Sequence, residues 1–126
     1  MKNEGIETFE SRIDPSFTVI VIYKEYEMYS TVRESLESLD NSVGALLPGH
    51  GTIVIDGERV EKEKLTDDHL LAIEAHEIAH ERLGHSGKRN QSHEEEADKL
   101  AIEILDSISK EKAAALLRDR MKSLDK

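Results

Sequence analysis

The sequence predicts an α+β fold in which a small, mostly antiparallel sheet packs on helices. Two short segments rich in β-branched and aromatic residues, Phe17 to Lys24 and Thr52 to Ile55, lie in the first half of the chain. Segments with apolar residues at helical spacing dominate the second half, from Thr66 onwards. The length of 126 residues suits one domain, residues 1–126, with a small core.

Residues 1–15 are polar and are expected to be irregular. The segment 17–24 is almost continuously apolar, which is typical of a strand buried on both faces, so we expect it to be central in its sheet. The next segment, 29–39, is expected to form a helix with one buried stripe, because Val32, Leu36 and Leu39 recur at helical spacing.

The segment 48–51 reads as a loop that leads into the second strand, Thr52 to Ile55. Asp56-Gly57 is a hairpin signal, which predicts that the chain returns along Glu58 to Glu61. If the segment 51–55 is an exposed edge, it can bind an extended peptide by main-chain pairing. The alternative is a strand that only covers the core.

A helix is predicted between Thr66 and Gly84. Thr66 supplies the cap, the acids at 67 and 68 suit the positive end of the helix dipole, and Gly84 supplies the stop. Between them lie apolar residues that give the helix a surface to bury: Leu71, Ala75, Ile78 and Ala79.

This helix carries the sequence His76-Glu-Ile-Ala-His80. Residues four apart on an α-helix lie about 40° apart on one face, so His76 and His80 can bind one zinc ion at about 2.0–2.1 Å. Glu77 lies about 60° from His80 around the helix, close enough to reach a water on that ion without being a ligand. This layout is typical of metal-assisted hydrolysis.

Three residues are candidates for the third ligand. His85 would lie on the opposite side of a continued helix, although Gly84 can end the helix first, so His85 stays open. His93 is the second alternative, and the third is its neighbour Glu94. The metzincin pattern is excluded, because it needs Gly and His at positions 83 and 86, where this chain has Leu and Ser.

Glu94 is the preferred third ligand. The residues Ser92-His-Glu-Glu95 resemble a capping box and predict that a second helix starts here, with Glu94 in its first turn. Glu94 and Asp98 share one stripe of this helix with two alanines, Ala97 and Ala101, which permit close helix approach. Asp98 is expected to accept the free ring N–H of a zinc-bound histidine. The acids at 95 and 96 are expected to be solvated.

A last helix, about 110–123, is expected to bury Ala113, Ala114, Leu117 and Met121.

The pattern His76-Glu77-x-x-His80 followed by Glu94-x-x-Ala97-Asp98 resembles the gluzincin peptidases, especially their ImmA/IrrE-type and HtpX-type groups. The resemblance covers residues 76–105, about a quarter of the chain. It implies a zincin-like fold, in which the sheet packs on the motif helix and on the helix that carries the glutamate. It also implies Zn²⁺ bound by His76, His80 and Glu94, with Glu77 as general base and acid.

Composition limits the partners. The net charge of −10 argues against a nucleic-acid partner, because phosphate binding needs clustered Lys and Arg. The absence of cysteine excludes disulfides and thiolate zinc ligands. The longest apolar run, 19–23, is too short to span a membrane, and no signal-peptide pattern is evident, so a cytoplasmic location is expected.

The leading hypothesis is a zinc endopeptidase that cleaves a peptide or protein substrate by a metal-activated water. The alternatives are a zinc-stabilised, catalytically silent binding or regulatory module and a helical interaction protein without metal. An oxyanion stabiliser is also expected. Its candidates are Tyr23, Tyr26, Tyr29, His50 and His85. His69 shares a stripe with the motif histidines and could flank the site, although a partly exposed histidine without a ligand role is the simpler interpretation.

Overall fold

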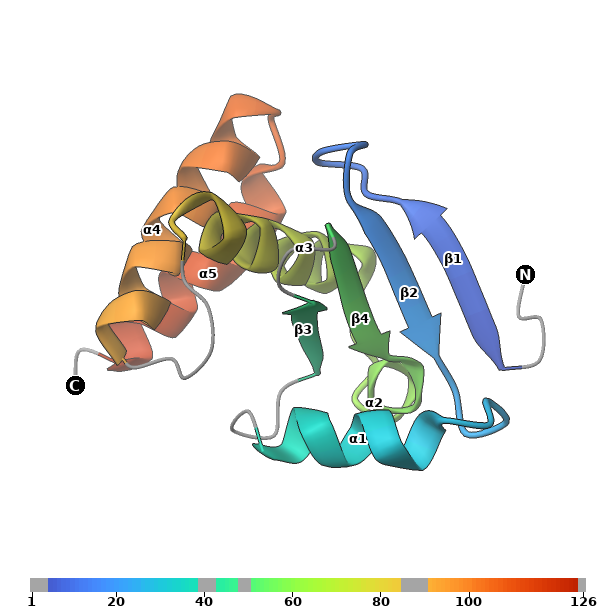
Figure 1. Cartoon of the computed structure of the whole chain (residues 1–126). Coiled ribbons are helices and arrows are strands. Elements are labelled where there is room, and N and C mark those ends of the chain that lie inside the picture. Colours follow the sequence, from blue (N-terminus) through green and yellow to red (C-terminus); the bar gives the residue numbers. More distant parts are fainter. Residues whose placement is uncertain (1–4, 39–42, 48–50, 85–90, 125–126) are drawn as a thin grey trace. The chain divides into compact units, whose positions relative to one another are not determined.

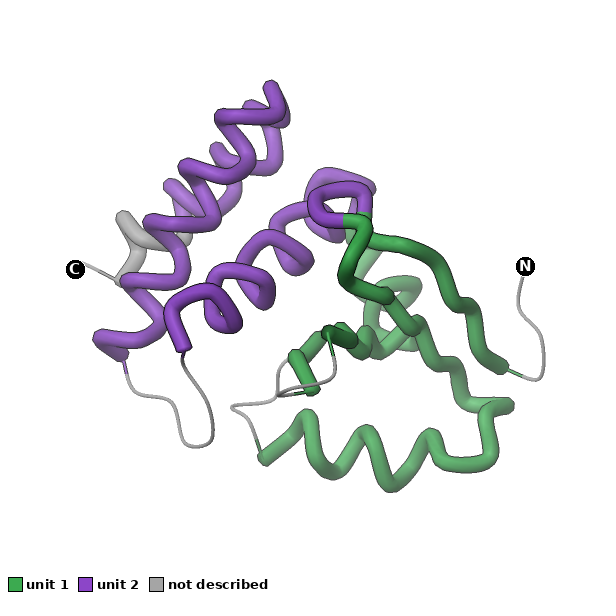
Figure 2. The backbone as a smooth tube through the Cα atoms, turned by 45° about the horizontal axis from the view of Figure 1, so that its top comes forward, with its two compact units in different colours: residues 1–11, 15–65 green, residues 12–14, 66–126 purple. Residues whose placement is uncertain are grey.

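The computed structural model describes residues 5–38, 43–47, 51–84 and 91–124. The chain forms two compact units, coloured separately in Figure 2. Residues 1–11 and 15–65 form the first, which we term the sheet unit. Residues 12–14 and 66–126 form the second, which we term the helical unit. The α+β class predicted from the sequence is confirmed.

The sheet unit holds a mixed four-stranded sheet with the order β1-β2-β4-β3 (Figure 1). Its strands are β1 (Ile6–Glu10), β2 (Thr18–Ile22), β3 (Gly44–Leu47) and β4 (Thr52–Asp56). The β1–β2 and β3–β4 pairs are antiparallel, whereas β2 and β4 are parallel. β2 lies inside the sheet, with Val19 fully buried, as its apolar sequence predicted.

Two strands were not predicted. The expectation that residues 1–15 are irregular is wrong, because β1 pairs along its whole length with β2, with Phe9 opposite Val19. β3 is only four residues long and was missed. The prediction that the segment 51–55 forms an edge is also wrong, because β4 lies between β2 and β3 and both of its sides are paired.

The predicted hairpin at Asp56-Gly57 is wrong, because a short helix, α2 (Gly57–Lys62), starts there instead. Asp56 is its N-cap: the carboxylate accepts hydrogen bonds from the backbone N–H groups of Glu58 and Arg59. The same carboxylate is fully buried and accepts a hydrogen bond from the Tyr29 hydroxyl at 3.0 Å. Tyr29 begins α1 (Tyr29–Ser38), the helix predicted at 29–39, whose buried residue is Leu36. Leu39 and the residues 48–50 of the predicted loop lie outside the described residues.

The helical unit consists of α3 (Asp67–Arg82), α4 (Gln91–Ser107) and α5 (Glu111–Leu124). α3 begins and ends as predicted: the Thr66 side chain accepts a hydrogen bond from the backbone N–H of His69, and Gly84 follows the helix with a φ of 73°. α4 begins at Gln91, so the predicted cap residue Ser92 lies inside the first turn. α5 buries Ala113, Ala114 and Leu117 as expected, while the side chain of Met121 lies outside the described part.

The segment 12–14, between β1 and β2 in the sequence, belongs to the helical unit. Arg12 forms ion pairs with Glu74 at 3.0 Å and with Asp67 at 2.6 Å, and Asp14 pairs with Arg82 at 3.2 Å. Ile13 packs against the core of the three helices. The segment therefore contacts α3 near both ends and at its centre.

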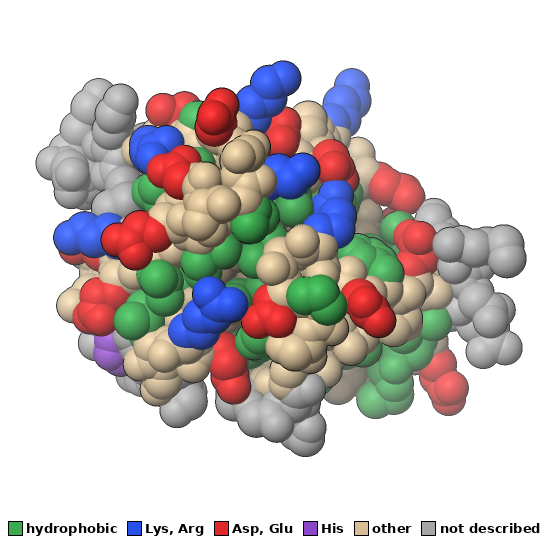
Figure 3. Space-filling view, turned by 90° about the horizontal axis from the view of Figure 1, so that it is seen from above, with side chains coloured by type: hydrophobic (Ala, Val, Ile, Leu, Met, Phe, Trp, Pro, Cys, Tyr) green, Lys and Arg blue, Asp and Glu red, His purple; other side chains and the backbone are tan. Residues whose placement is uncertain are grey.

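None of the helices in the described ranges is long and apolar enough to cross a lipid bilayer. Figure 3 shows one face of the molecule, on which Lys and Arg side chains are interspersed with Asp and Glu. The cytoplasmic location and the absence of a nucleic-acid partner stay predictions.

Candidate metal centre

The two motif histidines lie on one face of α3, as the helical period requires. Both are buried: His76 is 7% exposed and His80 is 0% exposed. Their rings meet edge to face, with centroids 4.5 Å apart and an interplanar angle of 86°. The two Nε2 atoms are 3.0 Å apart. The Nε2 atoms of the two rings therefore face the same point.

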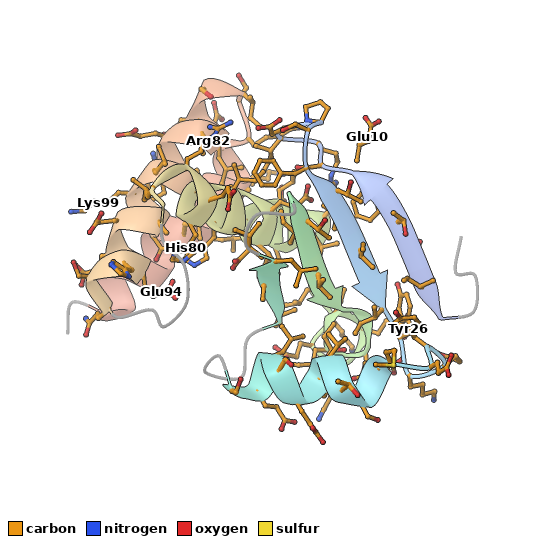
Figure 4. The ribbon with its side chains drawn as sticks, viewed as in Figure 1. Glu10, Tyr26, His80, Arg82, Glu94 and Lys99 are labelled. Atoms are coloured by element: carbon orange, nitrogen blue, oxygen red, sulfur yellow. The ribbon has the colours of Figure 1, made fainter. Side chains whose placement is uncertain are left out.

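Glu94 completes this group from the first turn of α4. Its Oε2 atom is 2.7 Å from Nε2 of His76 and 3.1 Å from Nε2 of His80. Figure 4 shows His80 of α3 and Glu94 of α4 next to one another. Within the described ranges, these three residues are the group whose donor atoms converge closely enough to hold a metal ion. The structure therefore brings together the three residues that the sequence analysis preferred as metal ligands.

The donor atoms fit a zinc ion. In a tetrahedral zinc site with bonds of about 2.0–2.1 Å, neighbouring ligand atoms lie about 3.3 Å apart. The three separations here are 2.7, 3.0 and 3.1 Å, so shifts of a few tenths of an ångström suffice. Two imidazole nitrogens and one carboxylate oxygen are also ligands that zinc accepts. Only part of the group reaches solvent, because the Glu94 side chain is 34% exposed and both histidines are buried.

The electrostatic environment of Glu94 favours its charged form. Burial raises the pKa of this carboxyl group, but hydrogen bonds from His76 and His80 and their positive charge lower it more. The net result is a pKa well below the usual value of a glutamate. A carboxylate rather than a carboxylic acid faces the two imidazoles, as metal binding requires.

Asp98 lies one turn after Glu94 on α4 and is fully buried. Its Oδ1 is 2.8 Å from Nδ1 of His76. Because a carboxylate can only accept, Nδ1 of His76 carries a proton in this contact, so Nε2 is the nitrogen of His76 that can bind a metal ion once it is deprotonated. The predicted role of Asp98, to orient His76, requires this contact, and the role itself stays a prediction.

Glu77 follows His76 on α3, and its side chain is buried, with the whole residue 4% exposed. Glu74 is the other buried acid of α3, and acids are rarely buried unless they are paired. Its role as general base stays a prediction.

Other residues named in the sequence analysis do not join this group. His93 lies next to Glu94 on α4, but its ring is not among the converging donors. His69 lies at the start of α3, where its Nδ1 is 2.8 Å from the Thr66 hydroxyl oxygen, so it completes the helix cap. His50 and His85 lie outside the described residues.

The tyrosine candidates for oxyanion stabilisation belong to the sheet unit. The hydroxyl of Tyr23 donates to Glu7 at 2.6 Å, and that of Tyr29 donates to Asp56 at 3.0 Å. The oxyanion role stays a prediction for both of them and for Tyr26.

One buried charged residue of α3 that lies close in sequence to the candidate ligands was not identified in the sequence analysis. Glu74 lies two residues before His76 and is fully buried, with Arg12 as its partner. An acid inside the apolar run Leu-Leu-Ala-Ile-Glu-Ala is the signal that could have found it, because a buried carboxylate needs a cation or hydrogen-bond donors. The sequence offers no indication that the partner is 62 residues away.

Comparison of the chain with models of protein families, with curated proteins and with solved structures gave no match. The resemblance to gluzincins therefore stays a prediction from the motif residues, and the geometry of the site carries the functional conclusion.

Proposed function

We propose that the chain is a zinc-dependent endopeptidase of the gluzincin type, built on a zincin-like fold. The observation that carries this proposal is the convergence of Nε2 of His76, Nε2 of His80 and Oε2 of Glu94 on one point. Three protein ligands are what catalytic zinc sites use, because the fourth position must stay open for water or substrate. A closed structural site would need a fourth protein ligand.

Each of the remaining site residues has a separate task in peptide hydrolysis. When bound, zinc supplies Lewis-acid chemistry that polarises a carbonyl group and makes water acidic near neutral pH. Glu77 accepts the proton of the attacking water and returns it to the leaving amine. Asp98 holds the Nδ1 proton of His76 and so keeps its Nε2 lone pair directed at the ligand group.

One observation favours the alternative, a zinc-stabilised binding or regulatory module. The three ligands come from two different helices, so an ion bound there links α3 to α4 whether or not it catalyses a reaction. Glu77 separates the two functions, because a structural site has no use for a general base. In the leading proposal the substrate is a peptide or a protein.

The test is cleavage of β-casein, with products identified by mass spectrometry, for the parent, Glu77→Gln and Glu81→Gln. Glu81 is the matched control, because it lies one turn further along α3 and outside the ligand group. We expect Glu77→Gln to lose activity by at least about 100-fold while it keeps its zinc, because general base catalysis contributes about 10²–10⁴-fold. Glu81→Gln should cleave like the parent. Equal activity of all three proteins would contradict the role of Glu77, and zinc binding without any cleavage would favour the binding module.

A further inference from the structure

The core of the helical unit consists largely of alanine. Of its twelve buried apolar residues among those described, seven are alanines, and they come from all three helices. They are Ala72, Ala75, Ala79, Ala97, Ala101, Ala113 and Ala114. Each alanine buries a single methyl group, whereas hydrophobic stabilisation grows with the apolar area removed from water. The helices can therefore approach closely, but their packing contributes little hydrophobic free energy per position.

The sheet unit has a different core. Its described residues include eleven buried apolar side chains, of which one is alanine. The others are large: Phe17, Val19, Val21, Ile22, Tyr23, Leu36, Leu46, Ile53, Val54 and Ile55. Its stability therefore has an ordinary hydrophobic source that does not depend on the metal centre.

Polar groups lie at the contact between α3 and α4. His76 faces both Glu94 and Asp98, and His80 faces Glu94, all within 3.1 Å. In their metal-binding forms the converging atoms of the three candidate ligands are all electron-pair donors, so they attract one another only when a proton or a metal cation lies between them. A divalent ion can bind all three atoms at once and so join the two helices.

Glu74 provides an internal comparison. It is also buried on α3, but it has a cation from the chain itself, Arg12, whose guanidinium is 3.0 Å away. The chain thus supplies a permanent partner for the acid on one side of α3. At the contact between α3 and α4, the donor atoms of His76, His80 and Glu94 instead lie close enough together to bind a metal ion.

We propose that the helical unit reaches its fully folded state only when a divalent metal ion links α3 to α4, whereas the sheet unit folds without metal. This inference rests on the metal site of the proposed function. It goes beyond that function because the folding of the helical unit then depends on the concentration of available metal ion. A small unit with a weak core commonly needs such a link, and the free energy of metal binding then becomes free energy of folding.

The test is amide hydrogen exchange of the full chain, measured by mass spectrometry after the metal is removed with a chelator and again after Zn²⁺ is added. At a free zinc concentration of about 1,000 times Kd, the open population of a metal-dependent unit falls about 1,000-fold. We therefore expect protection of amides in α3 and α4 to rise by two to three orders of magnitude, about 100- to 1,000-fold. Amides of β2 and β4, the internal reference, should change less than about threefold.

Three variants make the outcomes separable. Glu94→Ala, and Glu94→Gln as the variant of nearly equal size, should lose the zinc-dependent protection. Glu77→Gln should keep this protection while it loses cleavage. Zinc-dependent protection in a parent protein that cleaves no peptide bond would overturn the peptidase proposal alone. Bound zinc with unchanged protection of α3 and α4 would overturn the folding inference and leave the site intact. A zinc-dependent rise in the protection of β2 and β4 as large as that of α3 and α4 would also overturn the folding inference. Failure of the parent to bind zinc would overturn both the folding inference and the proposed function.

Discussion

The Asp98→Ala substitution should weaken zinc binding without removing any ligand. Asp98 is fully buried, and its Oδ1 accepts the Nδ1 proton of His76 at 2.8 Å. The substitution leaves a buried N–H without its acceptor and frees the His76 ring to rotate or to change tautomer. Loss of such an acceptor typically lowers metal affinity by about 10–100-fold, which corresponds to about 1.4–2.7 kcal/mol. The size of this effect agrees with about 1.5–3 kcal/mol for a hydrogen bond to a charged group.

Competition with a fluorescent zinc chelator at constant pH measures this affinity directly. The matched control is Glu103→Ala, which removes an exposed acid from the same helix and should leave Kd within about twofold, because an exposed charge is screened by solvent. Asp98→Asn adds a second comparison, because the amide oxygen can still accept the proton but has no charge, and it should give an intermediate Kd. An Asp98→Ala protein with the affinity of the parent would refute the assigned role of Asp98.

Three further predictions concern the stability of the two units, each taken by itself. Asp56→Ala should lower the free energy of unfolding of the sheet unit by about 2–3 kcal/mol in urea titrations, because it removes both the α2 cap and the acceptor of the Tyr29 hydroxyl; a change below about 0.5 kcal/mol would contradict this. Arg12→Ala should destabilise the helical unit by about 2 kcal/mol, less than for a fully buried pair because the Arg12 side chain is 37% exposed, and Arg12→Lys should recover part of the loss. An Arg12→Ala protein as stable as the parent would show that Glu74 does not depend on this pair. Burial, the hydrogen bond to Asp56 and the negative charge of Asp56 raise the pKa of Tyr29 to about 12. Because this value lies above the unfolded value of about 10, the contribution of Tyr29 is complete below about pH 10 and is lost as the pH rises to about 12. The stability difference between the parent and Tyr29→Phe should shrink over that range, and a constant difference would contradict the assignment.

Short-range rules were sufficient for the helices that carry the candidate site. Thr66 and Gly84 bracket α3 because capping and the left-handed conformation depend on local backbone geometry. The helical period then determines which side chains share a face, so His76 and His80 were predicted to lie together. The same period grouped Glu94 with Asp98 before the structure placed both next to His76.

The sheet was predicted less well, because strand pairing is a long-range property. β1 has three polar residues among its five and is paired on one side only, so its sequence carries little apolar signal. β3 is four residues long, and its pairing with β4 cannot be read from a local pattern. The parallel pairing of β2 with β4 places β4 inside the sheet, which is why the predicted edge was wrong.

Asp56-Gly57 shows how one local signal can serve two structures. Asp followed by Gly suits a tight hairpin turn, and Asp also suits a helix N-cap. In the structure the Asp56 carboxylate accepts from the backbone N–H groups of Glu58 and Arg59, which selects the helix. Tyr29 and Arg33 of α1 lie against the same carboxylate, so tertiary contacts support that choice.

Zinc content per chain, determined by mass spectrometry for the parent and Glu94→Ala purified without chelators or a histidine tag, tests the three-ligand centre most directly. The structure predicts about one zinc ion in the parent and little in the variant, because removal of one of three ligands leaves two imidazoles on α3 alone. No zinc in the parent after zinc is added back would contradict the metal centre. Equal zinc in both proteins would contradict Glu94 as the third ligand.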